Sequence, residues 1–379
     1  MVLVPIAALA LSYALYLLCA GHYSLEYSYD EGAHRRAAAL EGDRIKDDGF
    51  TRDGVYIPVG NDSLHAWLYS PSLGGASKGA WPLVVMGHGL GAQKDMGLAN
   101  YASAFTREGL AVLVVDYRTF GGSISQGNSY RNLINPWNHV EDILAAISAV
   151  RDGSVARGVA DVSRLFLWGT SFAGGHMLVA ASRLREQGYP VKGVISQVPH
   201  LDGRAASLRS MKKRGVVGCA RVLVLALADF ARSLLGMSPV YVKIAGVGDE
   251  TAYMSMTDDE YKIYLSKHPH TYIDDGDGGR IRKYQYMGGW QNKAPARTLL
   301  LISRYSPIAY VPQVDVPVLF IGSTTDLLCP IDIVRRAQGL LPHKNSELLE
   351  LDCSHSGVYL GAAFDAALAR MIDFVRRNM

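Results

Sequence analysis

The chain of 379 residues has few cysteines and little net charge. Four cysteines in this length do not make a disulfide framework, although a bond between Cys329 and Cys353 stays open. No Cys-x-x-Cys or His-Glu-x-x-His pattern occurs, so we expect no metal site. Lys and Arg number 38 against 35 Asp and Glu, and this balance of +3 points to no nucleic-acid partner.

Charge is also missing from the first twenty positions. Residues 2–20 are almost wholly apolar, with Ser12 as the main polar exception. About 18 or more such residues are long enough to span a bilayer, and no Lys or Arg precedes them, unlike a standard secretory signal. We therefore expect residues 1–20 to form a single-pass N-terminal membrane anchor. The alternative is a signal segment cleaved before Gly21 and a secreted protein. Residues 21–50 are polar and mixed, and are predicted to be a linker.

The most informative pattern is an apolar run that ends in a turn of small residues with a serine at its apex. Residues 165–168 predict a strand, Gly169–Gly175 contains the turn, and a helical pattern follows. This succession is typical of a nucleophile elbow, in which the hydroxyl of Ser171 projects at the end of a sheet. Ala173 stands where the usual Gly-x-Ser-x-Gly pattern has its second glycine. This departure is mild, because one methyl group can still fit between strand and helix.

A nucleophilic serine needs a base, and the base needs an acid that orients it. The apolar run at 318–322 predicts a buried strand, and Asp326 follows it. Residues 347–351 predict the next strand, and His355 lies in the loop after that strand. Catalytic groups of open parallel sheets gather at the carboxyl ends of the strands. We therefore expect Ser171, Asp326 and His355 to meet.

The glycine-rich turn after the predicted strand at 82–86 has two interpretations. Gly87–Gly91 stands where α/β-hydrolases place one oxyanion-hole amide, and we assign the two donors to the backbone N–H groups of Leu90 and Phe172. The same turn fits Gly-x-Gly-x-x-Ala, and Asp116 ends a later strand, as in a dinucleotide-binding oxidoreductase. That alternative leaves the serine, aspartate and histidine unexplained. Asp116 is therefore expected to make a structural salt bridge or loop contact.

Strands alternate with helices over most of the chain, and the hydrophobic content of 49% supports a substantial core. The alternation predicts a doubly wound, mostly parallel sheet. Residues 201–313 break the rhythm and show helical patterns only around 218–236 and 258–266. A structureless loop of that length is improbable. We expect an inserted cap, or lid, at 201–313 over the active site, and a core made of residues 51–200 and 314–379.

These segments resemble the α/β-hydrolase superfamily. They are most similar to its dienelactone-hydrolase-like, polyketide-transferase-like branch with a helical cap. The resemblance spreads over residues 50–379 and rests on Gly87–Gly91, Asp116–Gly121, Trp168–Ser171, Asp326–Pro330 and His355. Thr119 stands where a glycine is common. The resemblance implies the α/β-hydrolase fold with an inserted helical cap, a small-molecule acyl substrate and no cofactor.

The reaction implied by this resemblance is acyl transfer at ester or thioester bonds, through an acyl-enzyme. Ser171 would attack the carbonyl, His355 would carry the proton, and Asp326 would hold the imidazole tautomer. Asp202, which follows the predicted strand at 191–197, is the rival for the acid, but Asp326 is favoured. An acyltransferase or a serine peptidase would use the same residues, so both stay open. A non-catalytic binding protein is disfavoured, because no member of the triad is missing.

Overall fold

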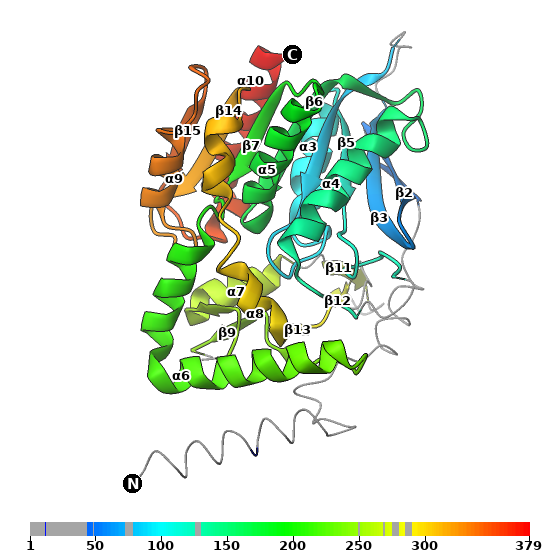
Figure 1. Cartoon of the computed structure of the whole chain (residues 1–379). Coiled ribbons are helices and arrows are strands. Elements are labelled where there is room, and N and C mark those ends of the chain that lie inside the picture. Colours follow the sequence, from blue (N-terminus) through cyan, green and yellow to red (C-terminus); the bar gives the residue numbers. More distant parts are fainter. Residues whose placement is uncertain are drawn as a thin grey trace.

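A nine-stranded sheet forms the centre of the molecule (Figure 1). The computed structural model describes Ser12 and residues 44–47, 49–72, 79–125, 130–248, 251–267, 270–274, 280–284 and 290–379. The strand order is β1-β2-β3-β5-β4-β6-β7-β14-β15. The bounds are β1 Arg44–Asp47, β2 Phe50–Val59, β3 Asp62–Pro71, β4 Trp81–Gly87, β5 Ala111–Val115, β6 Ala160–Thr170, β7 Gly193–Gln197, β14 Val318–Ser323 and β15 Glu347–Leu351. The six strands from β5 to β15 are parallel neighbours, and β1, β2 and β3 extend the sheet antiparallel.

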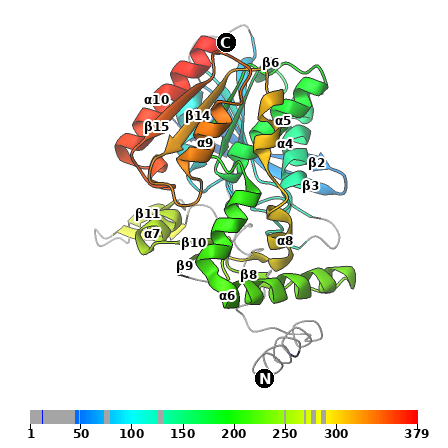
Figure 2. The same ribbon diagram turned by 60° about the vertical axis from the view of Figure 1, so that its left-hand side comes forward.

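Helices cover both faces of this sheet, which explains why its central strands are continuous apolar runs. Alternate residues of β4 divide between the faces, with Leu83 and Val85 in one core and Val84 and Met86 in the other. The helices α4 (Pro136–Arg151), α5 (Phe172–Glu186) and α9 (Ile331–Gln338) pack on the first face, and α3 (Leu98–Arg107) and α10 (Gly361–Asn378) on the second (Figures 1 and 2). The predicted doubly wound, mostly parallel sheet is confirmed.

Residues 201–313, called here the inserted segment, lie between β7 and β14 in the sequence, and most of the described elements of this segment lie below the sheet in Figure 1. Its longest helix, α6, bends at Gly215, whose φ of 65° favours glycine. The helix predicted at 218–236 is thus the second arm of a longer element, and the helix predicted at 258–266 is α7. The elements are α6 Gly203–Leu234, β8 Tyr241–Val242, β9 Ala245–Val247, β10 Met254–Met256, α7 Asp258–Ser266, β11 His270–Asp274, β12 Arg280–Tyr284, β13 Ala294–Pro295, η1 Ala296–Thr298, α8 Leu299–Ile302 and η2 Pro307–Gln313. A last short turn, η3 (Gly357–Tyr359), precedes α10.

The single-pass membrane anchor predicted for residues 1–20 is corrected. Within the part of the chain that the structure describes, no helix combines the length and the apolar character that a bilayer crossing requires. The membrane partnership and localisation inferred from that segment are therefore not kept. Apart from Ser12, residues 1–20 and the proposed cleavage site at Gly21 lie outside the described residues. Inside the predicted linker at 21–50, Arg44–Asp47 forms β1 and pairs with β2.

Candidate active site

Ser171 occupies a sharp turn between β6 and α5. The strand ends at Thr170 and the helix begins at Phe172, so one residue makes the reversal with φ 55° and ψ −117°. Such a conformation is strained for serine and persists only where its surroundings hold it. The Ser171 N–H donates to the carbonyl of Gln197 at 2.8 Å, and the N–H of His200 donates to the Ser171 carbonyl at 2.9 Å. The turn is therefore anchored to β7 and to the loop after it.

Small residues make this turn possible. A Cβ on Gly169 would collide with the carbonyl of Ala173, and a Cβ on Gly174 would lie 2.7 Å from Pro199. The methyl group of Ala173 is accommodated because it faces Gly87, where a Cβ would lie only 3.2 Å from it. The departure from the usual elbow pattern is thus matched by a glycine on the neighbouring strand.

The three predicted residues converge at the carboxyl ends of β6, β14 and β15. Nδ1 of His355 lies 2.6 Å from Oδ2 of Asp326, and its Nε2 lies 3.0 Å from Oγ of Ser171. Oδ1 of Asp326 accepts the N–H groups of Leu328 and Cys329 at 2.7 and 2.8 Å. A carboxylate that accepts a hydrogen bond from His355 keeps the ring proton on Nδ1, and Nε2 is then free to accept the proton of the serine. The arrangement can deprotonate Ser171.

Asp202, the rival acid, is engaged elsewhere. It is the N-cap of α6 and accepts the N–H of Ala205 at 3.0 Å. Its other oxygen pairs with Arg336 at 2.7 Å. A side chain that caps a helix and holds an arginine has a complete structural role, and the structure places Asp326 rather than Asp202 beside His355.

The predicted oxyanion donors border the same space as the serine. Leu90, Phe172 and Ser171 all line one cavity. Phe172 opens α5, so its N–H has no acceptor within the helix. The turn after β4 runs directly against the nucleophile, because a Cβ on Gly89 would lie 3.2 Å from Cβ of Ser171.

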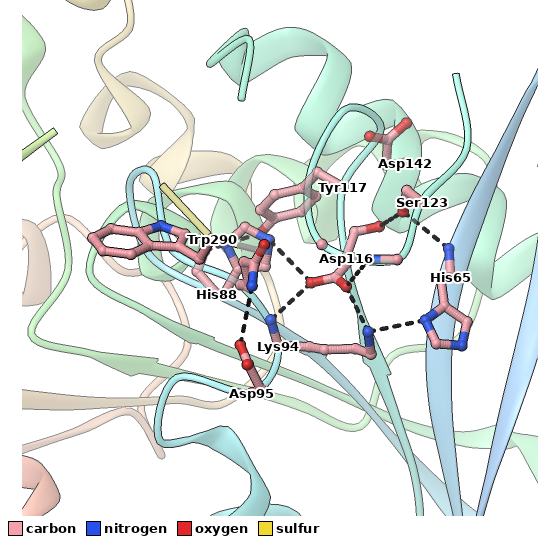
Figure 3. Close-up of polar contacts among 12 residues, drawn as sticks. His65, His88, Lys94, Asp95, Asp116, Tyr117, Ser123, Asp142 and Trp290 are labelled. Carbon is pink, nitrogen blue, oxygen red and sulfur yellow. Dashed lines mark hydrogen bonds and ion pairs between the residues drawn. The ribbon is translucent and has the colours of Figure 1, made fainter. Parts of the chain in front are cut away.

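Asp116 lies in a closed polar cluster (Figure 3). Nζ of Lys94 lies 2.6 Å from Oδ2 of Asp116, and the N–H of Lys94 donates to Oδ1 at 2.8 Å. Both side chains are fully buried. Burial alone would raise the pKa of Asp116, but the charges of Lys94 and His88 outweigh it and lower the pKa to about 2. The expected structural role of Asp116 is confirmed, and its carboxylate is engaged by Lys94 and Gly122 rather than open to the ribose of a dinucleotide.

This cluster also fixes the loop that carries Leu90. Lys94 belongs to that loop, whereas Asp116 follows β5 and accepts the N–H of Gly122 at 3.0 Å. Lys94 also donates to Nδ1 of His65 at 3.0 Å. Burial, and then the charge of Lys94, lower the pKa of His65 to about 3, so its ring is neutral and accepts. Lys94 and His65 were not predicted, because nothing in the sequence marks their proximity.

A second buried polar network, which was not predicted from the sequence, packs against Phe172. Nδ1 of His176 lies 2.6 Å from the hydroxyl of Tyr305, and Nε2 lies 3.3 Å from Nδ1 of His139. Burial holds the pKa of both histidines well below the ordinary value, so both rings are neutral. The ring of Phe172 packs edge-on against His176, 4.5 Å between centroids. Phe172, one of the two predicted oxyanion donors, is thereby held between α4, α5 and the inserted segment.

Cys329 is a rival nucleophile, because it lines the same cavity as Ser171. Burial raises the pKa of its thiol well above the ordinary value, which disfavours the thiolate. The described cysteines Cys219, Cys329 and Cys353 are all free, so the disulfide that the sequence left open is not formed. Asp326, Cys329 and His355 each offer a metal-ligand atom within 4.8 Å of the others. The oxygens of Asp326 are already occupied by hydrogen bonds, which favours proton transfer over metal binding here.

The cavity beside Ser171 has a volume of about 550 Å³. Apolar side chains of the inserted segment form much of its wall, including Met211, Val222, Leu223, Met254, Leu300 and Ile302. The basic residues that line it have partners: Arg209 pairs with Asp332, Lys213 donates to the carbonyl of Ser255, and Arg214 to that of Ala252. The cavity thus offers mainly apolar surface to a ligand.

Comparisons with known proteins support the fold described above. Residues 82–362 match a family described as alpha/beta hydrolase fold. The chain is 34% identical over 312 residues to the quorum-quenching protein AidA of Acinetobacter baumannii, covering 82% of this chain and 90% of that protein. It is 23% identical over 318 residues to the polyketide transferase af380 of Aspergillus fumigatus, covering 83% and 94%.

Solved structures show the same fold at low sequence identity. The structure of DcsB in complex with its substrate analogue has a TM-score of 0.67 at 21% identity, covering 86% of this chain and 100% of that chain. The alpha/beta hydrolase GrgF from Penicillium sp. sh18 has a TM-score of 0.65 at 20% identity, covering 86% and 99%.

Proposed function

The chain belongs to the alpha/beta hydrolase family, and on that premise we propose that it is a serine hydrolase of ester or thioester bonds. Ser171 is the nucleophile, His355 the general base and acid, and Asp326 the residue that orients the imidazole. The observation that carries this proposal is the hydrogen-bonded chain from Asp326 through His355 to Ser171, which ends at an apolar cavity.

The proposed reaction follows from these positions. Oγ of Ser171 attacks the carbonyl carbon while Nε2 of His355 takes the hydroxyl proton, and Asp326 stabilises the imidazolium that forms. The N–H groups of Leu90 and Phe172 donate to the oxyanion. One such donor is typically worth about 10²- to 10³-fold in rate. The leaving group then departs with the proton from His355, and the acyl group remains on Ser171.

The inserted segment is proposed as the cap domain, at 201–313, over a core of residues 51–200 and 314–379. Its apolar residues would hold the acyl chain, and about 550 Å³ lies within the usual range of small-molecule sites, roughly 300–1,000 Å³. A short acyl group would leave much of this apolar surface in water.

An acyl-chain series with one leaving group tests the proposal. Each methylene that enters the cavity gains about 0.8 kcal/mol, so kcat/KM should rise up to about fourfold per carbon until the cavity is full. Matched thioesters would show which acyl bond is preferred. A rate that is independent of chain length, or highest for acetyl esters, would contradict an acyl site in this cavity.

Acyl transfer to an acceptor other than water is the second candidate function. Its specific support is the similarity to a polyketide transferase, at 23% identity. Both functions share the acyl-enzyme and differ only in what removes the acyl group.

A further inference from the structure

A second, much smaller chamber adjoins the nucleophile. Its volume is about 20 Å³, and Ser171, Leu90 and Met254 line both this chamber and the large cavity. His355 lines the small chamber but not the large cavity. The proposed general base therefore faces a space that is distinct from the apolar acyl site.

This chamber has the size that a single water molecule needs, and its wall combines apolar residues with several residues that carry polar groups. A water requires roughly 10–15 Å³ of such volume and two to four polar partners. The residues that line it include four with polar groups, which are Ser171, His355, Tyr264 and Lys267, beside apolar ones such as Met96 and Leu98. Tyr264 is only 4% exposed, and its hydroxyl has no hydrogen-bond partner among the described residues. A buried hydroxyl without a partner is costly, and a bound water would satisfy it.

The helix α7 fixes Tyr264 at this place. Its first turn is capped by Thr257, whose Oγ1 accepts the N–H of Glu260 at 3.3 Å. The carboxylate of Glu260 accepts the N–H of Ser356, the residue after His355, at 2.7 Å. Residues four apart share one face of a helix, so the contact that ties Glu260 to the His355 loop also brings Tyr264 to the chamber.

Lys267 closes the chamber one residue after α7. Its ammonium lies 4.7 Å from the ring centroid of Tyr264 and 4.6 Å from that of Tyr359, and both rings also line the chamber. Burial lowers the pKa of Lys267 to about 8, so the ammonium form still prevails at neutral pH. A charged donor, a hydroxyl and the imidazole thus surround one small space.

We propose that this chamber binds the acyl acceptor, that the acceptor is water, and that Tyr264 is a positioning residue for it. The inference rests on the proposed function. The water oxygen bonds to the acyl carbon while Nε2 of His355 takes a proton from the water. The bond from that carbon to Oγ of Ser171 then breaks, Oγ recovers the proton from His355, and a carboxylic acid leaves. The chamber admits water, and at most an acceptor as small as methanol, so the enzyme hydrolyses its acyl-enzyme rather than transferring the acyl group to a larger acceptor.

Stopped-flow turnover of a p-nitrophenyl ester, with Tyr264→Phe and Tyr261→Phe, tests the position of the water. Tyr261 lies on the same helix, but its hydroxyl accepts from Nδ2 of Asn292 at 3.3 Å, and it does not line the chamber. Tyr264→Phe should slow hydrolysis of the acyl-enzyme about tenfold, for one lost hydrogen bond, with the rate of acylation within about twofold of the wild type. Tyr261→Phe should change neither rate. Equal effects on both steps, or none, would overturn the role of Tyr264.

Product analysis in the presence of methanol or 1-butanol tests the size limit. We expect the wild type to form some methyl ester and no butyl ester. Capture of the acyl group by both alcohols at similar efficiency would overturn the water-sized acceptor site. If the wild type forms no acyl group on Ser171 at all, the proposed function fails, and this inference fails with it. If the acyl-enzyme forms but neither test responds, the chamber's role alone fails.

Discussion

Two aspartates follow strands of the same sheet, and only one of them contacts a residue of the proposed active site. Asp326 follows β14 and holds His355, whose other nitrogen points to Ser171 and a cavity. Asp116 follows β5 and holds Lys94, and both of those side chains are fully enclosed. A carboxylate at the end of a strand is therefore not catalytic by position. Such a carboxylate takes part in a reaction only when its partner side chain can exchange a proton with a ligand.

The largest expected effect on activity is that of Asp326→Asn, which alters the aspartate of the proposed active site. The amide would favour the wrong imidazole tautomer, so kcat should fall on the order of 10⁴-fold with little loss of stability. Steady-state hydrolysis of a preferred ester measures it. Asp202→Asn is the matched control, because asparagine caps a helix as well as aspartate does. A larger loss for Asp202→Asn would make Asp202 the acid.

Lys94→Met tests the enclosed pair. It leaves Asp116 charged, buried and unpaired, and breaking such a pair typically costs about 3–5 kcal/mol. Denaturant unfolding measures the loss. Lys262→Met removes an exposed lysine that pairs with Asp258 on α7 and should change stability little. If the Lys94 variant keeps full stability but loses kcat, the Lys94–Asp116 pair takes part in catalysis and does not differ from Asp326 in role.

As the pH falls, the free energy of unfolding should decrease before Asp116 becomes protonated. Burial lowers the pKa of five histidines. It lowers that of His65 to about 3 and those of His88 and His200 to about 4, and it holds those of His139 and His176 well below the ordinary value. Below about pH 6.5 the unfolded chain binds protons that the folded chain does not, so the free energy of unfolding falls. Each such histidine contributes about 1.4 kcal/mol per pH unit down to its folded pKa. Burial raises the pKa of Asp142 to about 6, so on acidification the folded chain binds one proton there before the unfolded chain does. This partly offsets the fall in the free energy of unfolding.

Unfolding free energies at pH 7, 6, 5 and 4 test this account. His65→Asn should give a shallower decline than the wild type, because one titrating group is removed. The pKa of Asp116, about 2, adds its own loss only as the pH falls from about 4 towards 2. Stability that is constant from pH 7 to 4 would show that these rings are not held neutral.

The smallest expected effect is that of Asp202→Ala. It removes the side chain that caps α6 and pairs with Arg336, and a lost N-cap costs about 1 kcal/mol. Differential scanning calorimetry measures the loss, and kcat for a short ester should stay close to that of the wild type. A collapse of kcat without a change in stability would give Asp202 a direct role.

The sequence was sufficient to predict those features that local pattern and the order of the elements along the chain determine. The elbow at Ser171, the strands before Asp326 and His355, and the alternation of strands with helices are local signals, and parallel topology then brings their loops to one edge. The role of Asp116 was also predicted, but its partners were not. Lys94 and His65 meet Asp116 only through the packing of three separate strands and their loops.

The inserted segment was the hardest part to predict. Its strands have two to five residues each, too short for a hydrophobic period to show. The bend at Gly215 and the place of Tyr264 depend on contacts with the core, such as that between Glu260 and Ser356. The membrane anchor was predicted from the apolar length of residues 2–20 and from the lack of a preceding Lys or Arg, without any packing information.

The central claim is that Ser171 carries the acyl group, and acid-quenched mass spectrometry during turnover of an activated ester tests it most directly. We predict an added mass equal to the acyl group on the peptide that contains Ser171, and no adduct in Ser171→Ala. An acyl group found instead on Cys329, which lines the same cavity, or on no residue of the working enzyme, would contradict the account.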